Sequence, residues 1–150
     1  MRVAVITAST PIYRGQEEDA SGKVIRHILE EAGHDIVFQK ALPCDKTVLS
    51  TVMQRMVDGE LADLILTTGG AGCAAGDCMP EATMEIVDRP VPGIPEAMRA
   101  YTSQMTKRAM LNRSAAGIRG NVLIVNLPGA LITPCISRIK IHICHSLSKI

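Results

Sequence analysis

The chain has 150 residues, enough for one domain with a substantial core, and 47% of them are hydrophobic. Its 16 basic and 15 acidic residues leave a net charge of +1, so the charge balance gives no sign of DNA or RNA binding. The aromatic side chains are Phe38, Tyr13 and Tyr101 alone, which argues against base stacking on single-stranded nucleic acid. We therefore expect an aliphatic, methionine-filled core and no nucleic-acid partner.

No segment has the pattern of a signal peptide or of a membrane span. The apolar run after Arg2 covers only residues 3–6, which is the length of a strand, and no longer run could cross a bilayer. The five cysteines form no Cys-x-x-Cys pair and suit the reduced thiols of the cytoplasm. The sequence predicts a cytoplasmic protein with no membrane partner.

Predicted strands and helices alternate along the chain. Apolar runs predict strands over residues 3–7, 35–39, 61–66 and 121–126. Three of these runs are continuous and aliphatic, as expected of parallel strands covered on both faces. Apolar residues at helical spacing predict helices over residues 23–32, 48–57 and 96–111, and Pro80 is placed to open another. The alternation predicts one doubly wound α/β domain over residues 1–150, with a mostly parallel sheet and helices on both faces.

Two helical segments carry more specific expectations. In the helix predicted over residues 96–111, one side is apolar and consists of Ala97, Ala100, Tyr101 and Met105. In the tail, residues 134–150, isoleucines and a leucine follow helical spacing, although residues 139–143 also alternate as a strand would. We favour the helix because its spacing holds over the whole tail.

The stretch of residues 67–83, TTGGAGCAAGDCMPEAT, follows a predicted strand directly and is rich in glycine. Glycine lets the backbone approach a ligand closely and point several N–H groups at an anion. Asp77 adds a carboxylate to the same loop, and this combination suits a phosphate with a bound Mg²⁺. Glycines can also serve only to turn the chain, but a turn needs fewer small residues than this. We therefore expect a phosphate-binding loop.

Other predicted loops leave the same edge of the sheet, where ligands of open α/β sheets bind. The first loop, residues 7–22, carries Ser9 and Asp19, the second carries Asp45, and the last is residues 126–129. Asp45 and Asp77 could share one Mg²⁺ on a nucleotide. Asp45 could equally be a helix N-cap, Asp19 is better explained as a cap than as a ligand, and the last loop could be a plain turn.

Two other kinds of chemistry fit less well. Four residues separate Cys73 from Cys78, and His142, Cys144 and His145 lie together in the tail, but no spacing matches a structural zinc site. No serine stands in a Gly-x-Ser-x-Gly turn, which argues against a serine hydrolase.

Several short motifs occur in one order along residues 3–129, and more loosely to residue 150. Together they resemble the MoaB/Mog family of molybdenum-cofactor biosynthesis proteins. These motifs are the glycine loop, Asp77, Pro80-Glu81-Ala82-Thr83, Pro92-Gly93, Asn112-Arg113, Ala116-Gly117 and Asn126-Leu127-Pro128-Gly129. The resemblance implies a doubly wound α/β fold and homo-oligomers, either trimers or dimers of trimers. It also implies molybdopterin adenylyltransferase activity, in which AMP passes from Mg-ATP to the terminal phosphate of molybdopterin.

The resemblance also assigns roles to individual residues. Asp77 and Asp45 match acids that would hold Mg²⁺ and the triphosphate, so they are the candidate catalytic and metal-binding residues. The candidate substrate-binding residues are Ser9, Gly69, Gly70, Ala71, Gly72, Glu81, Ser114, Pro128 and Gly129. The partners implied are molybdopterin as substrate and ATP with Mg²⁺.

Four departures from the family pattern bear on activity. Ala71 replaces a threonine of the loop, Met79 replaces a threonine before Pro80, and Asn112 stands where a serine is common. The segment 130–133, which includes Ile132 and Thr133, lacks the family's lysine. The leading interpretation remains an adenylyltransferase. The alternatives are a non-catalytic molybdopterin-binding oligomer, which these losses favour, and a generic nucleotide-binding regulatory domain.

Overall fold

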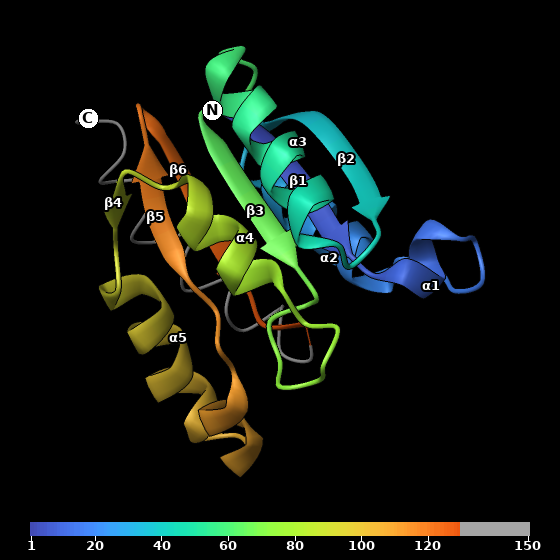
Figure 1. Cartoon of the computed structure of the whole chain (residues 1–150), viewed down its shortest axis with the longest axis vertical. Coiled ribbons are helices and arrows are strands. Elements are labelled where there is room, and N and C mark those ends of the chain that lie inside the picture. Colours follow the sequence, from blue (N-terminus) through green and yellow to red (C-terminus); the bar gives the residue numbers. More distant parts are fainter. Residues whose placement is uncertain (130–150) are drawn as a thin grey trace.

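The computed structural model describes residues 1–129, which form a six-stranded sheet with helices on both faces (Figure 1). The expectations for residues 130–133 and for the tail lie outside this range. In chain order the elements are β1 (Arg2–Ala8), α1 (Thr10–Tyr13), α2 (Ala20–Glu31), β2 (Asp35–Leu42), α3 (Lys46–Asp58), β3 (Leu64–Thr68), α4 (Met79–Ile86), β4 (Arg89–Pro90), α5 (Gly93–Ser103), the 3₁₀ helix η1 (Lys107–Leu111), β5 (Ala116–Arg119) and β6 (Val122–Leu127).

The strands lie in the order β2-β1-β3-β6-β5-β4. The first four are parallel, whereas β5 runs antiparallel to both β6 and β4. The chain leaves β1 toward β2 on one side and returns to β3 on the other, so the connection changes direction at β1. The carboxyl ends of β1, β3 and β6 therefore meet at one edge, where open α/β sheets bind ligands.

Alternate side chains of the central strands point into two separate cores. On one face, Val3 and Val5 of β1 pack with residues of α2 and α5, and on the other, Ala4 and Ile6 pack with residues of α3 and α4. Burial on both faces explains why these strands are continuous aliphatic runs. Each fully buried aliphatic side chain contributes about 1.5–3 kcal/mol to folding. The predicted fold class and the four predicted strands are confirmed.

The structure corrects the prediction for residues 96–111. That segment forms two helices, α5 and η1, with a break that includes Thr106. The backbone of Thr106 is extended, and its side chain caps η1. The inner face of α5 carries Met98 and Thr102, while Ala97 and Ala100 are exposed. Thr102 can be buried because its hydroxyl donates to the carbonyl of Met98 at 2.9 Å, as threonine commonly does inside helices.

Three short elements are additional to the prediction. They are α1, β4 and β5, which have four, two and four residues. Elements this short carry too few residues to show a hydrophobic period. Among the described residues, no helix is long and apolar enough to span a bilayer.

Candidate functional site

The glycine loop leaves β3 at the carboxyl edge of the sheet and begins with two glycines in the left-handed region. Gly69 has φ +82° and Gly70 has φ +64°. A Cβ built on Gly69 would lie 2.4 Å from the carbonyl oxygen of Ala8, at the end of β1. Only glycine fits this close approach, so the loop turns sharply over the end of the neighbouring strand.

A cavity of about 390 Å³ lies between this loop, the segment from α5 to η1 and the end of β6. Six predicted substrate-binding residues line it: Gly69, Gly70, Ala71, Gly72, Pro128 and Gly129. The structure therefore brings the glycine loop and the loop after β6 together at the carboxyl edge of the sheet, as predicted. In the sequence these two loops are at least 56 residues apart. Their role in binding remains a prediction.

The predicted acids do not line this cavity. One oxygen of Asp77, Oδ2, accepts a hydrogen bond from the amide of Ala74 at 2.9 Å, and the amide of Asp77 donates to the carbonyl of Ala74 at the same distance. Asp45 accepts from the amide of Val48 at 2.9 Å and is the N-cap of α3. The capping interpretation of Asp45 is therefore correct, and it occupies one carboxylate oxygen.

The two predicted serines also lie outside the cavity lining. Ser9 caps the short helix α1 through a contact of 3.4 Å with the amide of Ile12. Ser114 is buried, and its hydroxyl has no hydrogen-bond partner within residues 1–129. Asp19 caps α2 through the amide of Gly22, as expected from the sequence.

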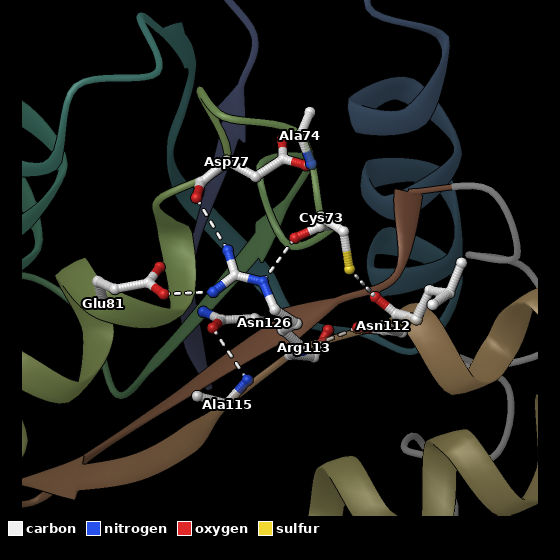
Figure 2. A network of polar contacts seen from close by, with 11 residues as sticks. Cys73, Ala74, Asp77, Glu81, Asn112, Arg113, Ala115 and Asn126 are labelled. Atoms are coloured by element: carbon white, nitrogen blue, oxygen red, sulfur yellow. Dashed lines mark hydrogen bonds and ion pairs between the residues drawn. The ribbon is translucent and has the colours of Figure 1, made fainter.

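Arg113 ties the two ends of the glycine loop together (Figure 2). Its Nε donates to the carbonyl of Gly72 at 2.6 Å and one terminal nitrogen donates to the carbonyl of Asp77 at 2.8 Å. The other terminal nitrogen forms an ion pair with Glu81 at the start of α4. The backbone amide of Arg113 also donates to the carbonyl of Ala71 at 2.9 Å. We call this set of contacts the Arg113 clamp.

In the clamp, Glu81 is the ion-pair partner of Arg113, and its predicted role in substrate binding stays a prediction. Its hydrogen bond with Arg113 lowers the pKa of the Glu81 carboxyl, and the same bond raises the pKa of Arg113. Glu81 therefore stays ionised and holds the guanidinium against the loop. The sequence motif Asn112-Arg113 pointed to this segment without giving Arg113 a role.

A buried polar network fixes α4 behind the loop. The side-chain amide of Asn126 donates to the hydroxyls of Thr67 and Thr83, at 3.0 and 2.8 Å, and its oxygen accepts from the amide of Ala115 at 3.1 Å. These bonds join β3, β6 and α4, and every polar atom of the Asn126 side chain has a partner. A fully satisfied network of this kind rigidifies the elements it connects.

Helix α4 begins without a side-chain cap. Its N-cap residue is Cys78, and Met79 is the first helical residue. Met79 is fully buried in the core between α3, α4 and the sheet. Met79 therefore contributes packing at the start of the helix.

The two acids lie on the side of the loop near Cys78. Burial is the main reason why the pKa of the Cys78 thiol is raised. Nearby negative charges raise this pKa further, those of Cys44, Glu81, Asp45 and Asp77. Within residues 1–129, no group of three or more His, Cys, Asp or Glu side chains could hold a metal ion. Mg²⁺, however, is commonly held by one or two carboxylates with phosphates and waters. One oxygen each of Asp45 and Asp77 accepts no hydrogen bond from the described residues, so this donor set fits that mode.

Residues 4–132 match a protein-family model described as "Probable molybdopterin binding domain". The chain belongs to this family. It is 36% identical over 131 residues to the molybdopterin adenylyltransferase of Helicobacter pylori strain J99, covering 86% of this chain and 74% of that protein. It is 30% identical over 130 residues to molybdenum cofactor biosynthesis protein B of Escherichia coli K12, covering 86% and 75%.

Solved structures of the molybdopterin-binding family share the architecture. The molybdopterin biosynthesis enzyme MoaB of Thermus thermophilus superposes with a TM-score of 0.90 at 36% identity, over 98% of this chain and 94% of that one. The resemblance to the MoaB/Mog family and the predicted fold are thus confirmed.

Proposed function

We propose that this protein is a molybdopterin adenylyltransferase of molybdenum-cofactor biosynthesis, with molybdopterin and Mg-ATP as substrates. The observation that carries the proposal is the glycine-lined cavity at the carboxyl edge of the sheet, in a chain that is 36% identical to a protein named for this activity. The acids on the other side of the same loop add a place for the metal.

In this reaction an oxygen of the pterin's terminal phosphate attacks the α-phosphorus of ATP. A new P–O bond forms, the bond from the α-phosphorus to the bridging oxygen breaks, and pyrophosphate leaves. No side chain needs to form a covalent bond with the substrates, so the protein contributes positioning and charge stabilisation. The Arg113 clamp would hold the glycine loop in shape while the N–H groups of the loop donate hydrogen bonds to phosphate oxygens.

Asp77 and Asp45 would hold Mg²⁺ through their remaining carboxylate oxygens. Mg²⁺, when bound, neutralises charge that develops on the phosphates. Asp77→Asn keeps an oxygen that can accept from the amide of Ala74 and removes the charge.

A second function, non-catalytic binding of molybdopterin, is favoured by one observation. Ala71 is only 7% exposed and lines the cavity, so the hydroxyl of a threonine is missing at a position that faces the ligand. A protein of this kind would bind the pterin and leave it unchanged.

The test is to incubate the protein with molybdopterin and Mg-ATP and to detect adenylylated pterin by mass spectrometry, with Asp77→Asn and added EDTA as controls. Product that depends on Mg²⁺ and on Asp77 supports the transferase. Binding of the pterin without product supports the second function, and ATP binding without pterin binding would favour a generic nucleotide-binding domain.

We also propose that the protein is a cytoplasmic homo-oligomer, a trimer or a hexamer. Large apolar side chains stand exposed on the segment from α5 to η1: Met105, Met110 and Leu111 are 52%, 77% and 55% exposed. Burial of such side chains against another subunit would remove apolar surface from water.

A further inference from the structure

The lining of the cavity beside the glycine loop contains one charged residue, Arg108, among glycines and apolar side chains. Its other polar lining residues are Cys73, Thr102, Thr106 and Asn112. No carboxylate belongs to this lining as far as the structure describes it, because the acids at the loop lie outside it. The fixed charge of the cavity wall is therefore positive.

The backbone of the loop adds donors to the same wall. Within residues 1–129, the amides of Ala71, Gly72 and Cys73 donate to no acceptor, although all three residues line the cavity. The oxygen of the Asn112 side chain accepts from the amide of Ser114 at 2.8 Å, which leaves the amide nitrogen of Asn112 to donate elsewhere. N–H groups that lack an acceptor, on residues that line a cavity, are suited to an anionic ligand.

Arg108 differs from the arginines that support the fold. Arg2, Arg113 and Arg119 each form an ion pair with a carboxylate. The side chain of Arg108 makes no hydrogen bond or ion pair with the described residues; only its backbone amide is engaged, by the hydroxyl of Thr106 at 3.3 Å. That cap fixes the start of η1 and places Arg108 at the cavity wall.

We propose that Arg108 is the cation that binds a phosphate group of the ligand in this cavity, together with the free amides of the glycine loop. An arginine offers a planar pair of donors that matches two phosphate oxygens. The terminal phosphate of molybdopterin and the triphosphate of ATP share this chemistry. Naming molybdopterin or ATP as the ligand rests on the proposed function. The inference that Arg108 binds a phosphate group does not.

The experiment compares Arg108→Gln with Lys107→Gln. Lys107 is the adjacent residue of η1, carries the same charge and does not line the cavity. Inorganic pyrophosphate, ATP and molybdopterin are each titrated into both variants and the wild type by calorimetry. Arg108→Gln should weaken binding of at least one of them about tenfold, because a hydrogen bond between charged groups is lost. Lys107→Gln should change affinity less than about twofold.

The ligand affected identifies the source of the phosphate. A loss with ATP and pyrophosphate alone places nucleotide phosphates in the cavity, and a loss with molybdopterin alone places the pterin phosphate there. Equal affinities of the two variants for every ligand would overturn the proposal, as would a wild type that binds none of them. Arg108→Lys, which keeps the charge and loses the planar pair, replaces Arg108→Gln if that variant fails to fold, with a smaller loss expected.

The same samples separate this proposal from the proposed function. A wild type that binds phosphate through Arg108 but forms no adenylylated pterin contradicts only the transferase. A wild type that forms the product while Arg108→Gln binds every ligand as well as Lys107→Gln contradicts only the role of Arg108.

Discussion

Arg113 holds the glycine loop through backbone carbonyls, in addition to the glycines that the turn itself requires. The guanidinium bonds to carbonyls at Gly72 and Asp77, and Glu81 balances its charge. A lysine could keep the ion pair but could not reach both carbonyls at once, because it presents a compact ammonium in place of a planar fork. Arg113 is therefore a positioning residue for the loop.

We predict that Arg113→Lys lowers kcat/KM for adenylyl transfer at least about tenfold while the free energy of unfolding falls by only about 0–1 kcal/mol, as for an exposed ion pair. Steady-state kinetics and chemical denaturation measure the two effects. Arg26→Lys is the matched control, since Arg26 pairs with Glu30 on the surface of α2, away from the loop. Equal activity of the two variants would show that the clamp does not matter for turnover.

Asp45 combines a cap with a proposed metal contact, and substitution can separate them. Asp45→Ser keeps a side-chain oxygen for the amide of Val48 and removes the charge. We predict a large fall in Mg²⁺-dependent turnover with an unfolding midpoint close to that of the wild type. If turnover is unchanged and only Asp45→Ala destabilises the protein, by about 1 kcal/mol, then Asp45 acts as a cap alone.

The place of the glycine loop at the carboxyl edge of the sheet could be predicted because the loop follows a strand directly in the sequence, and the cap at Asp45 because it precedes a helix. The metal-binding role of Asp45 and Asp77 stays a prediction. The role of Arg113 could not be predicted, because its partners in the clamp lie 32 to 42 residues away and a single arginine carries no local pattern. The same holds for Arg108, whose significance depends on the cavity that three separate segments enclose.

At the scale of elements, the ends of β3 and β1 approach closely, since a Cβ on Gly69 would lie 2.4 Å from the carbonyl oxygen of Ala8. The turn from β3 passes over the carboxyl end of β1 at Gly69, so the loop packs directly against the central strand. The two apolar strands were predictable from their hydrophobic runs. The break between α5 and η1 was not, because the extended backbone of Thr106 lies within an otherwise helical pattern.

Gly69→Ala tests this packing. The new Cβ would meet the carbonyl of Ala8 and would also force alanine to a φ of +82°, so we predict a loss of at least about 2 kcal/mol of unfolding free energy. Gly76→Ala is the control in the same loop, because its Cβ would meet nothing within 4 Å and its φ is not positive. Thermal and chemical denaturation should show the Gly69 variant alone as severely destabilised.

At the scale of the whole molecule, the segment from α5 to η1 exposes apolar side chains on the side away from the core. The sequence predicted one apolar side of this helix, with Ala97, Ala100, Tyr101 and Met105. The spacing could not show whether that side faces the core or the solvent, because both arrangements have the same helical period. The core side holds Met98 and the hydroxyl of Thr102, which a count of apolar residues overlooks.

We predict that the wild type is a trimer or hexamer at micromolar concentration and that Met105→Glu combined with Met110→Glu shifts it toward the monomer. Both residues are more than half exposed, so the substitutions should leave the fold of one chain intact. Light scattering gives the mass, and Met84→Glu is the control, because Met84 is 47% exposed on α4. A wild-type mass equal to that of one chain would contradict the prediction.

The Arg113 clamp also has a consequence for when the glycine loop can fold during synthesis of the chain. Gly72 leaves the ribosome 41 residues before Arg113, an interval of about 2–8 s at 5–20 residues per second. During that time the residues of β1 and β3 have been synthesised, whereas those of β6, the neighbour of β3 in the sheet, have not. The clamp cannot form before Arg113 has been synthesised, so we expect a nascent chain stalled before residue 113 to carry paired strands β1 and β3 and a glycine loop without its final shape.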